Sequence, residues 1–253
     1  MMDGQWHVNG YFDSTKLTGL YEAAQRREST RLFAAAPCAE KWSALLAAAD
    51  RFALPGMRIA LGMCDTSLFQ PLMGLFMKFE NVQRFAAIIT QDASPQSLVN
   101  AGVSGELFLL HAVELGLGGC WVSGTFKRGQ VGLRLQEGEK IVALLALGEP
   151  KHASQPPLTR KRKPMAELCP EYDALPPALR EVADYIRIAP SAMNLQPWRI
   201  TRMGDAAVTV TVGIARLRLD LGIGVCHALL ALGSTPAHFS LSPDGMAVTI
   251  TLL

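Results

Sequence analysis

An uncharged stretch of the chain from residue 221 to residue 241 restricts what the chain can fold into. It contains no Asp, Glu, Lys or Arg, and an apolar helix of this length could span a bilayer. However, it also contains His227, Ser234 and Pro236, which are polar or break helices. We therefore expect a helix over residues 219–232 that is buried inside the protein and is followed by a turn.

Other periodic segments predict a mixture of helices and strands. Residues 97–117 carry apolar side chains at helical spacing, whereas residues 84–90 and 141–147 are continuous apolar runs of strand length. Further helices are predicted over residues 13–31, 39–52 and 176–188, and further strands over residues 206–214 and 246–252. Because there is no regular β-α-β spacing, the expected fold class is α+β.

Composition limits the class of protein. The 253 residues are 49% hydrophobic, which suits a large core, and the formal net charge of +2 gives no reason to expect nucleic acid or a membrane as partner. Residues 1–9 have no apolar core and do not resemble a signal peptide. The five cysteines are Cys38, Cys64, Cys120, Cys169 and Cys226. Their scatter predicts neither a disulfide framework nor a structural metal site, and it favours a reducing cytoplasm.

Two parts of the chain resemble each other. Residues 51–63 and residues 187–203 each predict the end of a helix, a turn containing proline and then a strand, and an apolar helix follows each of them. A chance likeness between two such units is the alternative. The matching order and turn residues favour an internal duplication, with a first copy over residues 1–165 and a truncated second copy over residues 166–253.

Two basic motifs are candidate anion sites. Arg27, Ser29 and Arg31 place two guanidinium groups four residues apart, with a hydroxyl between them, at the end of a predicted helix. Guanidinium groups suit phosphate, although a solvated helix end is the alternative. The run from Arg160 to Lys163 is either a solvated loop or a patch that binds an anion.

Residues 189–198 form the motif with the most specific pattern. Pro190 fixes the backbone, and Ser191, Asn194 and Gln196 supply donors and acceptors that could bind the edge of a heteroaromatic ring. The alternative is a helix start capped by Ser191 or Asn194.

A fourth motif, residues 116–126, is rich in glycine. It lets the backbone approach a flat ring closely, and an N–H near Ser123 and Gly124 could then bond to the ring. The spacing does not fit a dinucleotide fingerprint, and a tight turn after a helix is the alternative.

Together these motifs resemble the FMN-dependent nitroreductase family, over most of residues 20–200. The family patterns R-x-S-x-R-x-F, A-P-S-x-x-N-x-Q-P-W and G-L-G-x-C-W-x-G-G-F correspond here to residues 27–33, 189–198 and 116–126. A strand that ends in L-G corresponds to the strand ending at Leu147 and Gly148, and a basic stretch corresponds to residues 160–168. The order differs, because the A-P-S segment follows the basic run here and residues 53–57 hold a degenerate version of it. The resemblance implies a nitroreductase-like central mixed sheet flanked by helices, with the second copy making a single-chain pseudodimer that has one flavin site.

The resemblance also implies roles for particular residues and a function. It implies that the flavin phosphate is held by Arg27, Ser29, Arg31, Arg160 and Arg162, that the ring is flanked by Pro190, Ser191, Asn194 and Gln196, and that the backbone at Ser123 and Gly124 faces the flavin N5. FMN would carry the chemistry, with NAD(P)H as electron donor and a nitroaromatic or quinone as acceptor, so no catalytic side chain and no metal are expected. The expected state is a monomeric pseudodimer or a weak homo-oligomer. The alternative is a flavin-binding or flavin-sensing protein, or the same fold without redox turnover.

Overall fold

The computed structural model describes residues 17–69, 78–152 and 160–253, and it confirms the α+β class. The helices are α1 (Thr18–Arg26), α2 (Ala39–Arg51), α3 (Pro95–Glu114), α4 (Met165–Leu168), α5 (Pro177–Ile188) and α6 (Arg218–Leu232). The strands are β1 (Phe33–Ala35), β2 (Met57–Met63), β3 (Arg84–Thr90), β4 (Gly118–Val122), β5 (Lys140–Pro150), β6 (Arg199–Arg202), β7 (Ala207–Thr211), β8 (Ala237–Leu241) and β9 (Ala247–Leu252). The start of the helix predicted from residue 13, and residues 153–159 of the predicted linker, lie outside the described residues.

The strands form two sheets. The first has the order β1-β5-β3-β2, with β4 also paired to β5, and the second has the order β6-β7-β9-β8. The strand ladders are antiparallel in the described residues, and parallel pairing occurs there in the isolated bridges Ser29–Gly119 and Leu32–Glu80. Strands β3 and β5 lie in the middle of the first sheet, which is why their sequences are almost continuously apolar.

The two sheets share one pattern of connections. In the first sheet the pairing runs β2-β3-β5-β4, and in the second it runs β6-β7-β9-β8. A long helix leaves the second strand of each series and leads to the strand at its end, α3 between β3 and β4 and α6 between β7 and β8. The two halves of the chain therefore have the same order of strands around one central helix each.

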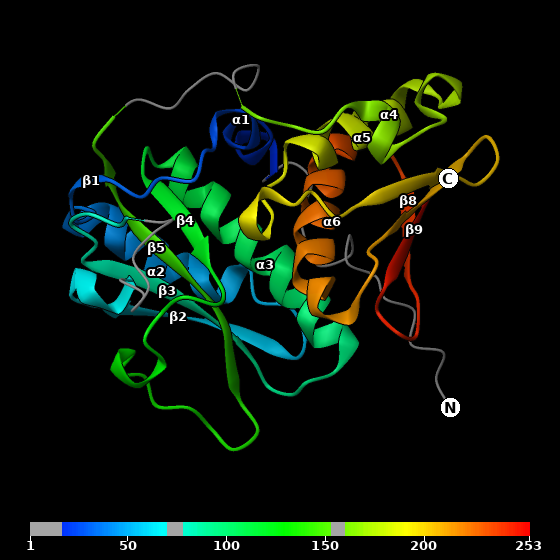
Figure 1. Ribbon diagram of the computed structural model, residues 1–253. Coiled ribbons are helices and arrows are strands. Elements are labelled where there is room, and N and C mark those ends of the chain that lie inside the picture. Colours follow the sequence, from blue (N-terminus) through cyan, green and yellow to red (C-terminus); the bar gives the residue numbers. More distant parts are fainter. Residues whose placement is uncertain (1–16, 70–77, 153–159) are drawn as a thin grey trace.

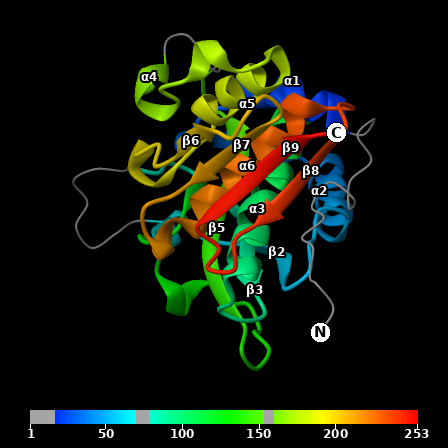
Figure 2. The ribbon, with the colours of Figure 1, turned by 90° about the vertical axis from the view of Figure 1, so that its right-hand side faces the viewer.

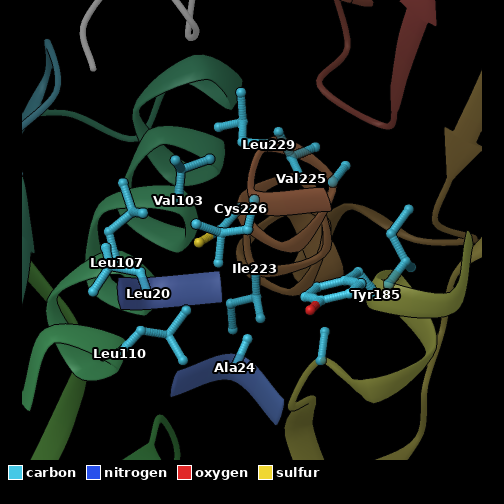
Figure 3. Packing of buried hydrophobic residues seen from close by; sticks show 14 of the residues in the cluster. Leu20, Ala24, Val103, Leu107, Leu110, Tyr185, Ile223, Val225, Cys226 and Leu229 are labelled. Carbon is cyan, nitrogen blue, oxygen red and sulfur yellow. The ribbon is translucent and has the colours of Figure 1, made fainter. Parts of the chain in front are cut away.

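Helices α3 and α6 form a layer between the two sheets (Figure 1), and the perpendicular view shows the same order of layers (Figure 2). The helices approach closely where Gly102 faces Gly222. A Cβ atom on either glycine would lie less than 3.0 Å from backbone atoms of the other helix. Figure 3 shows side chains of α1, α3, α5 and α6 meeting around this layer, among them Leu20, Val103, Tyr185 and Ile223.

The uncharged stretch is a buried helix followed by a strand. Nearly every residue of α6 is buried, because the helix is covered on its sides by α3, α5 and the second sheet. In the described residues no helix is long and apolar enough to cross a membrane. Strands β4 and β8, where the sequence analysis predicts no strand, owe their conformation to pairing with β5 and β9. Both are short and lack a strong local strand signal, so residues far away in the chain decide them.

Candidate functional site

Arg27 is buried at the end of α1. The helix stops at Arg26, and Arg27 leaves it with φ −58° and ψ 129°, which turns its side chain into the protein. Only 2% of the residue is exposed. The alternative of a solvated helix end is therefore wrong for Arg27, because its guanidinium group is shielded from water.

The segment after Arg27 runs beside the start of β4. Thr30 donates its backbone N–H to the Gly119 carbonyl at 3.0 Å, and Ser29 and Gly119 form a parallel bridge. A Cβ on Gly118 would lie 2.6 Å from the Thr30 Oγ1, so glycine permits this approach. Ser29 and Arg31 both lie beside the buried Cys120 thiol, whose pKa is raised by burial and lowered in part by these neighbours. Gly118 and Gly119 are therefore packed against other residues of the protein, and they do not face open space.

The basic run comes back to Arg27 from more than a hundred residues away in the sequence. Burial, together with the nearby charge of Arg27, lowers the pKa of Arg160 to about 10. Burial lowers the pKa of Arg162 to about 10 as well, with contributions from Arg27, Arg160 and Arg187. The structure therefore brings together three guanidinium groups that the sequence assigns to one anion site.

Several N–H groups of these arginines have no acceptor in the described residues. Arg27 Nε and Nη1, Arg31 Nε and Arg162 Nε are buried and make no hydrogen bond there. A buried donor without an acceptor costs about 1–3 kcal/mol, and more when it is charged. Guanidinium groups bind phosphate oxygens with strong, directional hydrogen bonds. The donor set and its excess positive charge therefore fit a phosphate group.

The loop of residues 189–198 is attached to the basic run by its polar side chains. Asn194 accepts a hydrogen bond from Arg162 Nη1 at 3.0 Å and donates to the Lys161 carbonyl at 3.1 Å. Gln196, which is 3% exposed, accepts the Lys163 backbone N–H at 2.7 Å. Arg162 also donates Nη2 to the Ile188 carbonyl at 2.8 Å. The head group of Arg162 and the side chains of Asn194 and Gln196 thus connect the loop to the arginine cluster.

The loop has an unusual backbone and does not start a helix. Met193, Asn194 and Gln196 have φ values of 52°, 56° and 47°, in a region that residues other than glycine rarely adopt. Such strain is concentrated at functional sites. Residues Ala192–Asn194 form only a single 3₁₀ turn, and the Ser191 hydroxyl accepts the Gln196 N–H at 2.8 Å and does not cap that turn. The alternative of a capped helix start is therefore wrong.

Pro190 is buried and leads into this loop, whereas Ser123 and Gly124 lie at the end of β4 and are exposed. Arg27 is near the start of that strand, so a rise of about 3.3 Å per residue places Ser123 roughly 13 Å further along it. A Cβ on Gly124 would meet nothing within 4 Å, so the space in front of this glycine is open. The predicted place of Ser123 and Gly124 beside a flavin ring remains a prediction.

Two buried ionisable residues behind Arg27 are missing from the sequence-based site. Glu106 of α3 is fully buried and accepts hydrogen bonds from Trp121 Nε1 at 2.7 Å and from His227 Nε2 at 3.0 Å. Its Oε1 lies 3.6 Å from Arg27 Nε. Burial alone would raise the pKa of Glu106, but His227 and Arg27 together hold it below its usual value. A single Glu or His inside an apolar helix is the sequence signal that could have shown this cluster.

Asp220, at the start of α6, holds the loop from its other side. Its Oδ1 accepts the Ala192 N–H at 2.8 Å, and its carbonyl accepts Trp198 Nε1 at 2.8 Å. Burial raises the pKa of the Asp220 carboxyl, and the bond from Ala192 lowers it only in part. The ionised form is therefore disfavoured by folding.

This raised pKa predicts how the Asp220→Asn variant responds to pH. The Asp220 carboxyl ionises at a lower pH in the unfolded chain than in the folded protein. Between these two pKa values, the stability of wild type falls as the pH rises. Asn cannot ionise, and its oxygen can still accept the Ala192 N–H. We expect the difference in free energy of unfolding, variant minus wild type, to rise as the pH increases from about 4, the unfolded pKa, through the raised folded pKa.

The measurement is urea denaturation of ligand-free protein across this pH range. Asp50→Asn, on the exposed side of α2, is the matched control and should show no such trend. A stability difference for Asp220→Asn that stays constant with pH would contradict the prediction.

Comparison with known proteins gives the family. Residues 19–232 match the family described as "Putative TM nitroreductase". The chain belongs to this nitroreductase family. A search of curated proteins found no match.

One solved structure shows the same fold as this nitroreductase-family chain, and others match part of it. A structure described as "a putative nitroreductase" from Thermotoga maritima MSB8 matches with a TM-score of 0.66 and 19% identity, over 92% of this chain and 93% of that one. An FMN-dependent nitroreductase of Clostridium difficile R20291 matches with a TM-score of 0.42 and 18% identity, over 53% and 89%. A protein described as "a putative nitroreductase in complex with fmn" from Desulfovibrio desulfuricans matches with a TM-score of 0.43 and 20% identity, over 59% and 94%.

The nitroreductase-family chain shows no metal centre in the residues that the structure describes. No group of three or more His, Cys, Asp or Glu residues is placed there to hold a metal ion. The cluster of polar groups described above lies between α1, α3, α6 and the 189–198 loop, and it is dominated by guanidinium groups.

Proposed function

We propose that this protein is an FMN-dependent oxidoreductase that takes electrons from NAD(P)H and passes them to an electron-poor acceptor such as a nitroaromatic or a quinone. The observation that carries the proposal is the set of buried guanidinium donors without acceptors, at Arg27, Arg31 and Arg162. Membership of the nitroreductase family supports the redox chemistry.

The phosphate of FMN would be held by Arg27, Arg31 and Arg160, with Ser29 beside them. Arg27 and Arg160 are close enough to lower the pKa of a neighbouring guanidinium, so a phosphate dianion would relieve repulsion between like charges. Arg162 would act on the same anion through its buried Nε, because its Nη groups are already bonded to the loop and to the Ile188 and Lys161 carbonyls.

The ring of FMN would lie towards the 189–198 loop and the end of β4. Pro190, Ser191, Asn194 and Gln196 would fix the loop beside it, acting through backbone position more than through free side-chain groups. The backbone at Ser123 and Gly124 would face the ring from β4, where the space is open. When bound, FMN would supply the two-electron chemistry, while these residues bind it, orient it and shield one side from water.

The division of the chain into two copies, residues 1–165 and 166–253, is also a proposal. The shared strand order of the two sheets supports it, and so does the matching position of α3 and α6. Asn100 of α3 bonds to the Pro55 carbonyl at 2.9 Å, much as Asp220 of α6 bonds to the Ala192 N–H. One copy would provide Arg27 and the other would provide the 189–198 loop, as two subunits would in a dimer.

An absorbance spectrum of the purified protein tests the flavin assignment directly. We expect visible flavin bands, release of FMN on denaturation, and oxidation of NAD(P)H that depends on an added quinone such as menadione. Flavin binding without turnover would establish the alternative, a flavin-binding or flavin-sensing protein. Protein that neither contains FMN nor takes it up when FMN is added would contradict the proposal.

The stoichiometry of flavin tests the two-copy arrangement. Residues 53–57 lack the polar side chains of the 189–198 loop, so only one complete site is expected. FMN released from saturated protein should amount to about one per chain, with the chain monomeric or weakly associated in gel filtration. A value near two per chain would mean that residues 53–57 also serve a flavin.

A further inference from the structure

The carboxylate of Glu106 sits at the meeting point of three separate parts of the chain. It is on α3, and it contacts Arg27 after α1, Trp121 on β4 and His227 on α6. Glu106 and His227 are fully buried, and Arg27 is 2% exposed. Glu106 and His227 lie behind the arginine cluster, and the proposed function gives neither of them a role.

Arg27 needs a counter-ion in order to remain buried. A guanidinium without one would lose its hydration and gain nothing in return, and such a group moves to solvent if its side chain can reach it. Among the charged groups near Arg27, Glu106 is the acidic residue with the strongest effect on its pKa, ahead of Cys120 and Glu28. Burial still lowers the pKa of Arg27, and Glu106 is the group that offsets this effect most.

The position of Glu106 is fixed independently of Arg27. One carboxylate oxygen accepts the Trp121 indole N–H and the other accepts His227 Nε2. Burial lowers the pKa of His227 despite the neighbouring carboxylate, so the imidazole is neutral and donates through Nε2. The carboxylate is therefore held by two neutral donors and retains its negative charge for Arg27.

We propose that Glu106 is a positioning residue for the flavin phosphate: it holds the Arg27 guanidinium in place, and His227 from the second half of the chain fixes Glu106. This inference rests on the proposed function, because it gives Arg27 the phosphate as ligand. It adds that α6 contributes to the phosphate site from behind, although α6 carries none of the predicted phosphate ligands.

The Glu106→Gln variant removes the charge and nearly keeps the shape. A glutamine also has one acceptor oxygen for two donors, so its amide N–H₂ faces either Trp121, or His227 and Arg27. The Arg27 side chain should then leave its buried position for part of the time. FMN would bind only the fraction of the protein in which Arg27 is in place. We expect FMN affinity to fall by about tenfold or more, since apparent affinity scales with the fraction of competent protein.

Riboflavin separates this role from a merely structural one, because it has the ring of FMN without the phosphate. Its affinity should change by less than about threefold in Glu106→Gln, measured by fluorescence titration of ligand-free protein. Glu114→Gln, on the exposed end of the same helix, is the control and should leave both affinities unchanged. Equal losses for FMN and riboflavin, or a gain for FMN, would overturn the proposal.

A pair of variants at His227 gives a second test if Glu106→Gln does not fold. His227→Gln keeps a donor for Glu106, whereas His227→Leu removes it. We expect FMN affinity to fall in His227→Leu and to be largely retained in His227→Gln, with riboflavin affinity little changed in both. Identical FMN affinities in the two variants would overturn the role of His227.

The position of Arg27 can be observed without any flavin. In crystals of ligand-free Glu106→Gln or His227→Leu, the Arg27 guanidinium should be displaced from its buried place, and a guanidinium that stays there would overturn the proposal. Wild-type protein that binds FMN no more tightly than riboflavin would instead contradict the proposed phosphate site. In that case the crystal structures alone decide whether Glu106 holds Arg27.

Discussion

Arg27→Ala is expected to lower FMN affinity by about 10- to 150-fold, because a hydrogen bond to a charged group contributes about 1.5–3 kcal/mol. Arg27 offers its buried Nη1 donor for such a bond. The same change should lower the free energy of unfolding of the ligand-free protein by about 3–5 kcal/mol, because it leaves the buried Glu106 without its counter-ion. The measurements are urea denaturation and flavin titration by fluorescence.

Arg26→Ala provides the matched control for this prediction. Arg26 is the neighbouring residue, its side chain is 52% exposed, and it forms an ion pair with Glu22 on the surface of α1. Loss of such a pair costs less than about 1 kcal/mol and should not affect flavin binding. Equal flavin occupancy in wild type and Arg27→Ala, measured as released cofactor, would remove Arg27 from the phosphate site.

The Gly102→Ala variant should destabilise the whole fold, although alanine is the better helix former. In an exposed helix this change gains about 1 kcal/mol. Here the new Cβ would lie less than 3.0 Å from the Leu219 carbonyl oxygen and the Gly222 Cα. These are backbone atoms, which cannot move away by a change of rotamer. Helices α3 and α6 must separate, so we expect a net loss of at least about 2 kcal/mol in the free energy of unfolding.

The separation of α3 and α6 should also be visible at the phosphate site. Glu106 lies on α3 and His227 on α6, and the hydrogen bond from His227 Nε2 to Glu106 Oε1 is 3.0 Å long. Separation of the helices would break this bond, so FMN affinity should fall together with stability. Gly129→Ala is the control, since a Cβ at Gly129 would meet nothing within 4 Å. Chemical denaturation that shows Gly102→Ala as stable as wild type would mean that the two helices tolerate a wider spacing.

The helices and strands of the core could be predicted from local sequence. Strand β3 matches the predicted residues 84–90, and α6 begins within one residue of the prediction and ends where it was predicted to end. In these elements, burial on all sides makes the sequence continuously apolar, so the local pattern and the tertiary environment agree. Strands β4 and β8 could not be predicted, because glycines in β4 and the short length of β8 give no strand signal until β5 and β9 are beside them.

The candidate site could be predicted only in part. The motifs at Arg27 and at residues 189–198 are visible as residue types at fixed spacing, and the structure brings both to the basic run. The sequence did not indicate which groups the side chains of Asn194 and Gln196 bind. Most of their side-chain hydrogen bonds go to residues 161–163, more than thirty positions earlier in the chain, and Gln196 Nε2 donates to the Asn194 carbonyl. These bonds occupy polar groups that were expected to face a ring.

The sequence by itself determined the α+β class, the family and the residue types that could hold a phosphate, because periodicity and motif spacing are local properties. Only the tertiary structure decided that Arg27 is buried and that Glu106 and His227, 121 residues apart, form one cluster behind it. An isolated glutamate or histidine in an apolar helix has no partner within its own segment. Its charge is stabilised by groups on other helices, and the sequence does not specify which of them lie next to it until the helices pack.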